Sequence, residues 1–190
     1  MIEVYTDGGA HTDGEKVGGW GVVILGLKSE PIQISGGAKG TTNNRMELIA
    51  LLTAVKYLLD LHMENEPIRI TSDSQYVMNT VTTWMYSWAK KGWVNSSHEP
   101  VQNQDIIKVL LDLYPRLKQV DYNWVKGHAG SKYNELCDNL ATMEQQKLLG
   151  LDPVDRTNSI LESDPTYLKL NAMTKQDIIR YVMDHGFKVE

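Results

Sequence analysis

Alternating hydrophobic and polar residues mark the first forty positions of the chain as strands. Residues 2–6 alternate between two faces and stop at Asp7-Gly8-Gly9, which predicts a strand that ends in a glycine-rich turn. Residues 19–27 and 31–38 predict two further strands, separated by a short polar break. Three strands in succession indicate an antiparallel meander.

From Asn44 the hydrophobic positions change to the spacing of a helix. Leucine and valine recur every three or four residues, which predicts a helix of four turns or more, and Asn44 with Glu47 fits an N-cap and its capping-box partner. Residues 67–72 predict a short strand that ends on Asp73, where Asp73-Ser74 begins another helical segment. The sequence thus places carboxylates at two strand ends.

The second half of the chain predicts one more strand between two helices. A tryptophan-rich stretch precedes a helix over 102–113, and residues 119–125 alternate as a last strand. A glycine-containing loop then leads into a helix over 131–149 that Gly150 can cap. The main domain is therefore expected to span residues 1–149.

The tail has a different composition. Residues 150–166 are typical of a linker or an extended loop. Residues 167–190 predict a small C-terminal extension, in which a capping box at Thr174 and a stop at Gly186 frame a short amphipathic helix. We expect this helix either to dock on the main domain through Ile178, Val182 and Phe187 or to bind a protein partner.

Composition limits the classes of protein. In 190 residues, 42% are hydrophobic and 23% charged, the balance of a soluble globular protein. We expect no membrane span and no secretion signal, hence a cytoplasmic protein. The sequence implies no oligomer, so a monomer is expected by default. The lone cysteine, Cys137, is expected in the core. A net charge of −5 means that nucleic-acid binding would need local basic patches or metal ions.

Four acidic residues are candidates for a metal site, although each has a structural alternative. Asp7 could be a turn former, Asp73 an N-cap, Glu47 half of a capping box, and Asp138 a solvated charge on a helix. Ligand sites in α/β sheets gather at strand carboxyl ends. Clustered carboxylates repel one another unless cations neutralise them, and oxygen-only ligands favour Mg²⁺ or Mn²⁺.

Five runs of residues, in order and spacing, resemble bacterial-type ribonuclease HI over about residues 1–149. They are Tyr5-Thr6-Asp7-Gly8-Gly9, Thr41-Thr42-Asn43-Asn44-Arg45-Met46-Glu47-Leu48, Thr71-Ser72-Asp73-Ser74-Gln75-Tyr76-Val77, Trp124-Val125-Lys126-Gly127-His128-Ala129-Gly130 and Asn134-Glu135-Leu136-Cys137-Asp138.

This resemblance implies an α/β, ribonuclease H-like fold with a five-stranded mixed sheet flanked by helices. It implies that Asp7, Glu47, Asp73 and Asp138 bind two Mg²⁺ ions, which Mn²⁺ can replace, with Asp7 bridging both. The implied reaction is endonucleolytic hydrolysis of the RNA strand of an RNA/DNA hybrid, leaving 3′-hydroxyl and 5′-phosphate ends. His128 would assist proton transfer or product release.

The resemblance also implies which residues contact the hybrid. Amide side chains would read the minor groove, where a 2′-hydroxyl separates RNA from DNA, and a hydroxyl would bind a DNA-strand phosphate. The implied substrate-binding residues are Gly8, Thr42, Asn43, Asn44, Ser74, Gln75, Trp84, Trp88, Lys90 and Lys91. For the amides the alternative role is helix capping, and for the tryptophans it is core packing.

The chain departs from the family at two places. Only two adjacent lysines follow Trp84 and Trp88, where the family often has a more basic protrusion, so we expect weaker binding and a shallower salt dependence. Residues 10–16 of the first turn replace a family segment that usually has Asn and Pro and is one residue shorter. The other functions considered are an inactive or weakly active hybrid-binding module and a DNA-directed nuclease of the same fold.

Overall fold

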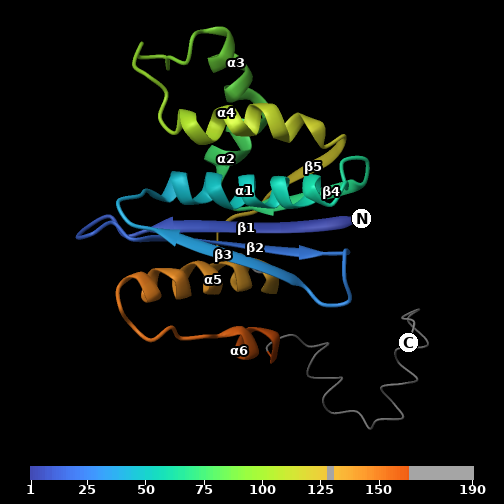
Figure 1. Ribbon diagram of the computed structural model, residues 1–190, viewed down its shortest axis with the longest axis vertical. Coiled ribbons are helices and arrows are strands. Elements are labelled where there is room, and N and C mark those ends of the chain that lie inside the picture. The colour runs from blue at the N-terminus through green and yellow to red at the C-terminus, as the bar shows by residue number, and fades with distance from the viewer. Residues whose placement is uncertain (128–130, 163–190) are drawn as a thin grey trace. The chain divides into compact units, whose positions relative to one another are not determined.

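The computed structural model describes residues 1–127 and 131–162, and these contain one mixed sheet with helices on both faces (Figure 1). Five strands pair in the order β3-β2-β1-β4-β5. They span Ile2–Ala10 (β1), Gly18–Leu25 (β2), Ile32–Ala38 (β3), Pro67–Ser72 (β4) and Gln119–Trp124 (β5).

The first three strands form an antiparallel meander, and β4 and β5 join β1 in parallel. This confirms the predicted fold. The turn predicted at Asp7-Gly8-Gly9 is wrong, because β1 runs on to Ala10 and these residues pair with Gly21, Trp20 and Gly19 of β2. Asp7 therefore lies inside a strand.

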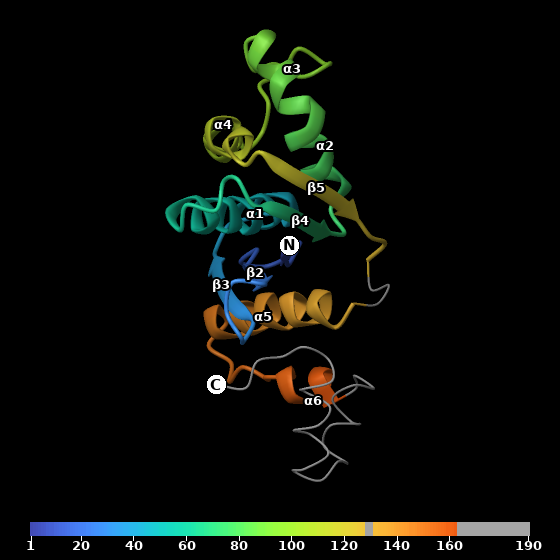
Figure 2. The same cartoon turned by 90° about the vertical axis from the view of Figure 1, so that its right-hand side faces the viewer.

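Helices cover the two faces of the sheet. One face carries α1 (Asn43–Asp60), with α4 (Gln104–Leu113) packed beside it, and the other carries α5 (Lys132–Leu148) (Figures 1 and 2). The helical segment after β4 consists of α2 (Gln75–Asn79), a π-helical turn η1 (Thr80–Trp84) and α3 (Met85–Lys90). A 3-10 turn, η2 (Tyr114–Arg116), joins α4 to β5.

The main hydrophobic core lies between the sheet and α1. Leu48, Leu51 and Leu58 of α1 are fully buried together with strand residues such as Val4 and Ile70. Burial of large aliphatic side chains supplies most of the driving force for folding. On the other face, Cys137 of α5 is fully buried, which confirms its expected core position.

The start of α1 differs from the prediction, and the start of α2 rules out the alternative role of Asp73 as an N-cap. The N-cap of α1 is Thr42, whose hydroxyl accepts a hydrogen bond from the Arg45 N–H at 3.2 Å, so Asn44 is a helical residue and Glu47 is no capping-box partner. The N-cap of α2 is Ser74, not Asp73. Hydroxyl side chains thus cap both helices, and Glu47 and Asp73 are left for another role.

The chain divides into two compact units, Met1–Asp155 and Arg156–Glu190. Within the second unit the structure describes a short helix α6 (Thr157–Glu162), where the sequence predicts a linker or an extended loop. The helix predicted near Thr174 and its three docking residues lie outside the described residues. None of the helices described has the length and apolar character needed to cross a membrane.

Candidate active site

Three carboxylates converge where β1, β4 and α1 meet. One oxygen each from Asp7, Glu47 and Asp73 lies within 4.8 Å of the others. Asp7 comes from β1, Asp73 directly follows β4, and Glu47 comes from the second turn of α1. Because β1 and β4 are parallel neighbours, the chain brings Asp7 and Asp73 to the same end of the sheet.

Glycines on the sheet allow both covering helices to approach this point. A Cβ atom on Gly8 would lie 2.5 Å from the backbone carbon of Met46 and 2.6 Å from the nitrogen of Glu47. A Cβ atom on Gly21 would lie 2.5 Å from the Cys137 carbonyl oxygen, next to Asp138. Any larger residue would push α1 or α5 outward, so these glycines set how close Glu47 and Asp138 come to Asp7.

The carboxylates line an open hollow of about 350 Å³. Asp138 of α5 borders it together with the three clustered carboxylates, so all four residues predicted to bind metal face one space. We call this space the carboxylate hollow. Its residues are Asp7, Gly8, Gly9, Asn43, Glu47, Asp73, Asp138, Ala141, Thr142 and Gln145.

Burial and neighbouring carboxylates make Asp7 and Glu47 hard to ionise without cations. Burial, followed by the charges of Asp73 and Asp138, raises the pKa of Asp7 to about 7. Burial and then Asp7 raise the pKa of Glu47 well above its usual value. Divalent ions would remove this penalty, because they replace repulsion by attraction.

The donor set fits a hard divalent ion. All the groups are carboxylate oxygens, which suit Mg²⁺ or Mn²⁺ better than Zn²⁺. The Oε2 atom of Glu47 is buried and has no hydrogen-bond partner within the described residues. A buried carboxylate oxygen without a partner is costly, and a metal ion would satisfy it.

The predicted substrate residues with amide or hydroxyl side chains lie at the starts of two helices, α1 and α2. Thr42, Asn43 and Asn44 are exposed at the start of α1, and Asn43 Oδ1 accepts a hydrogen bond from the Ala10 N–H at 2.6 Å. Ser74 and exposed Gln75 begin α2, directly after Asp73. In the chain, Asn43 and Asn44 thus shortly precede Glu47, and Gln75 shortly follows Asp73.

The tryptophans form a separate surface. Trp84 is 38% exposed, and its ring centroid lies 5.7 Å from that of half-buried Trp88. The pair borders a hollow of about 810 Å³ with exposed Lys91, and exposed Lys90 precedes it. We call this the tryptophan surface. The hollow is lined by Trp84, Ser87, Trp88, Lys91, Val94, Asn95, Ser96 and His98.

Several residues at the site were not predicted from the sequence. Gln145 lies seven residues after Asp138 on α5, and its amide donates to the Gly9 carbonyl at 3.0 Å. That helical spacing could have revealed it. Trp124 of β5 donates its indole N–H to the Asp73 carbonyl at 2.9 Å. A Cβ atom on Gly127 would lie 2.9 Å from Asp73 Oδ2, so the backbone of this residue lies close to the Asp73 carboxylate.

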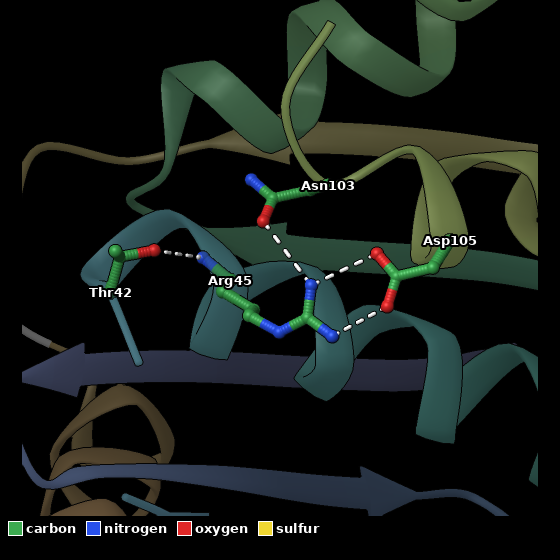
Figure 3. A network of polar contacts seen from close by, with 4 residues as sticks. All are labelled: Thr42, Arg45, Asn103 and Asp105. Carbon is green, nitrogen blue, oxygen red and sulfur yellow. Dashed lines mark hydrogen bonds and ion pairs between the residues drawn. The ribbon is translucent and has the colours of Figure 1, made fainter. Parts of the chain in front are cut away.

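One further feature beside the site is an ion-pair network at the start of α1 (Figure 3). The Arg45 guanidinium donates to both carboxylate oxygens of Asp105 and, at 3.4 Å, to Asn103 Oδ1. We call these contacts the Arg45 network. His128, the remaining predicted catalytic residue, lies outside the described residues.

Comparison with known proteins finds a family model and relatives that share one name. The family model described as RNase H matches residues 1–146. A protein of a Shewanella strain named "Ribonuclease H" is 43% identical over 143 residues, which cover 74% of this chain and 85% of that protein. A Treponema denticola protein of the same name is 38% identical over 160 residues, which cover 78% of this chain and 99% of the relative.

Solved structures share the fold. A foamy viral protease-reverse transcriptase, solved in complex with dsDNA, superimposes with a TM-score of 0.64 at 25% identity and covers 77% of this chain and 94% of that one. LC9-RNase H1, described as a type 1 RNase H with the type 2 active-site motif, has a TM-score of 0.61 at 23% identity. The match covers 88% of this chain and 83% of that chain.

Proposed function

The chain belongs to the RNase H family and is a ribonuclease H, an endonuclease for the RNA strand of RNA/DNA hybrids, and we propose that it cleaves by a two-metal-ion mechanism in the carboxylate hollow. The observation that carries this proposal is the convergence of Asp7, Glu47 and Asp73, with Asp138 on the same space. The buried Glu47 Oε2 atom supports it further, because this potential metal ligand has no hydrogen-bond partner among the residues that the structure describes.

Asp7 has the position of a shared ligand. Its side chain clusters with Glu47 and Asp73, and its ionisation also responds to Asp138. Asp7, Glu47, Asp73 and Asp138 would together hold the ions, with Asp7 nearest the centre of the cluster's charge. Mg²⁺ is the proposed ion, and Mn²⁺ can replace it because it takes the same oxygen ligands.

When bound, the ions activate a water for attack on a phosphodiester and stabilise the leaving oxygen. The phosphorus–oxygen bond to the 3′ oxygen breaks, so the products carry 3′-hydroxyl and 5′-phosphate ends. The protein's own share is to hold four carboxylates rigidly on β1, α1, α5 and the end of β4. His128 is proposed to assist proton transfer or product release.

Recognition of RNA is proposed to rest on three amide side chains, which lie at the starts of α1 and α2. Asn43 and Asn44 lie at the start of α1, and Gln75 lies two residues beyond Asp73. An amide both donates and accepts, as does a 2′-hydroxyl, so these side chains suit that group. Thr42 is proposed to contact a DNA-strand phosphate, and Trp84 and Trp88 are proposed to contact the hybrid.

The test compares nucleic acids and metals in one assay. End-labelled RNA/DNA hybrid, double-stranded RNA, single-stranded RNA and double-stranded DNA are each incubated with Mg²⁺ or EDTA, with the Asp7→Asn variant alongside. We expect cleavage of only the RNA in the hybrid, only with Mg²⁺ and only by the wild type, with 5′-phosphate products. Binding of the hybrid without cleavage would instead indicate an inactive binding module.

A further inference from the structure

Arg45 lies where α1 and α4 meet, and both ends of this residue are held (Figure 3). Its backbone N–H donates to the Thr42 hydroxyl that caps α1. Its guanidinium forms two parallel bonds to Asp105, Nη1 to Oδ1 at 2.9 Å and Nη2 to Oδ2 at 2.6 Å. A bidentate pair fixes direction as well as distance, which a lysine could not do.

The Arg45 network also reaches α2. Nη1 of Arg45 donates to Asn103 Oδ1, and Asn103 Nδ2 donates to the Tyr76 hydroxyl, each at 3.4 Å. Asn103 takes the left-handed conformation with φ 60°, which asparagine tolerates better than most residues. Both of these bonds are long, so the bidentate pair with Asp105 supplies most of the strength of the network.

The residues next to the network are those proposed to contact the hybrid. Thr42, Asn43 and Asn44 directly precede Arg45, and Gln75 directly precedes Tyr76. The ring of Tyr76 meets that of Trp84 edge-on, with centroids 6.1 Å apart. The network thus ties the start of α1, the start of α2 and the tryptophan surface to one another.

We propose that Arg45 is a positioning residue for the hybrid: its bonds to Asp105 and Asn103 hold the α1 start, the α2 start and the tryptophan surface in register along one duplex. This inference rests on the function proposed above. It differs from a direct role of Arg45 as a phosphate contact, in which the guanidinium would either leave its bidentate pair with Asp105 or use its remaining N–H groups.

The Asp105→Asn variant separates the two roles by the sign of its effect. If Arg45 acts as a phosphate contact, this variant should bind the hybrid more tightly. It removes a negative charge near the phosphates and releases the Arg45 guanidinium from its ion pair. If Arg45 positions the contacts, binding weakens instead. Arg45→Lys keeps the charge and loses the bidentate geometry, so it should weaken binding to a similar degree.

The measurements are the Kd for the hybrid in EDTA, by fluorescence anisotropy at fixed salt, and KM and kcat with Mg²⁺. For both variants we expect Kd and KM to rise roughly three- to tenfold, with kcat changing much less. The double variant Arg45→Lys/Asp105→Asn should bind no worse than either single variant, because all three lack the same bidentate pair.

The chain offers a matched control pair in Arg69 and Asp121. Arg69 Nε donates to Asp121 Oδ2 at 2.9 Å and joins β4 to β5, and neither residue is a proposed substrate contact. Arg69→Lys and Asp121→Asn should leave the Kd within about twofold. Thermal unfolding of every variant checks that it is folded at the assay temperature.

The inference is overturned if Asp105→Asn binds the hybrid as tightly as the wild type or tighter. It is also overturned if the variants lose only thermal stability while KM and Kd stay at the wild-type values. Failure of the wild type to cut or bind the hybrid would contradict the proposed function itself. The two failures are therefore distinguishable within one set of experiments.

Discussion

The carboxylate hollow and the tryptophan surface are built by opposite means. The carboxylate hollow gathers like charges partly out of water, and Glu47 is only 8% exposed. The tryptophan surface presents aromatic rings and lysines to solvent at the end of a helical segment. The first arrangement is unfavourable until cations bind, whereas the second is stable as it stands.

This difference separates chemistry from binding. The carboxylates lie on the central strands and on the helices that pack directly on them. The tryptophans and lysines lie on η1 and α3, outside the sheet. Substitutions in the carboxylate hollow should thus alter kcat, metal binding and pH dependence, while those on the tryptophan surface should alter affinity alone.

The largest effect is expected from Glu47→Gln. Loss of one negative ligand should lower kcat with Mg²⁺ by about a thousandfold or more, since metal ions supply several kcal/mol of transition-state stabilisation. Hybrid affinity in EDTA should not fall, because a carboxylate near the phosphates is removed. Single-turnover cleavage and anisotropy measure the two quantities.

The matched control for Glu47 is Glu144→Gln. Glu144 lies on α5 and bonds the Ser35 hydroxyl at 2.9 Å and Lys147 at 3.2 Å, outside the carboxylate hollow. Its kcat should stay near that of the wild type. An equal loss of activity in both variants would show that the carboxylate hollow has no special role.

The second prediction concerns stability without metal. Burial and neighbouring carboxylates raise the pKa of Asp7 to about 7, so the folded chain binds more protons than the unfolded chain between about pH 4 and that value. Its free energy of unfolding should therefore fall as the pH rises through this range. Asp7→Asn should be more stable than the wild type by roughly 1–3 kcal/mol at pH 8 in EDTA.

Urea unfolding at several pH values tests this prediction. The advantage of Asp7→Asn should shrink as the pH falls toward 4, because the Asp7 carboxyl is then protonated in the folded chain. Mg²⁺ at pH 8 should stabilise the wild type more than the variant. An advantage that stays constant with pH would contradict the repulsion argument, and Asp121→Asn serves as the exposed control.

Local patterns in the sequence were sufficient to predict most of the fold. Period-two and helical spacing located all five strands and the helices α1, α4 and α5 to within a few residues. The errors fell at Asp7-Gly8-Gly9 and at Asn44, where two structures compete. Glycine pairs usually end strands, but here Gly8 pairs with Trp20 of β2, and its missing Cβ leaves room for the close packing of α1.

The candidate site was predictable in its carboxylates and not in the contacts that hold them. Asp7, Glu47, Asp73 and Asp138 each belong to a specific run of residues. Long-range contacts such as Arg45 with Asp105 leave no periodic signal, because the partners lie on different helices whose packing no local pattern describes.

The third prediction moves to the tryptophan surface. Trp84→Ala should raise the hybrid Kd about tenfold and leave kcat nearly unchanged, because a partly exposed ring supplies contact area but no chemistry. Trp84→Phe, which keeps an aromatic ring, should recover most of the affinity. Saturation kinetics distinguish the effects, and a large fall in kcat for Trp84→Ala would break the separation of chemistry from binding.

The smallest effect is expected from the two lysines. Lys90 and Lys91 are exposed at the end of α3, and each can neutralise one phosphate without holding a fixed geometry. Replacing each by Gln should raise the Kd only about twofold to threefold near physiological salt. The salt dependence of the Kd tests the role of the two lysines more directly than this change in the Kd itself.

Removal of one lysine–phosphate pair should reduce the slope of log Kd against log salt concentration by roughly one. Titrations at several salt concentrations, with Lys56→Gln of α1 as an exposed control, give that slope directly. A slope that does not change in Lys90→Gln/Lys91→Gln would exclude both lysines from the duplex interface. The tryptophan surface would then bind through its rings alone, and the negative net charge of the chain would be offset chiefly by the metal ions in the carboxylate hollow.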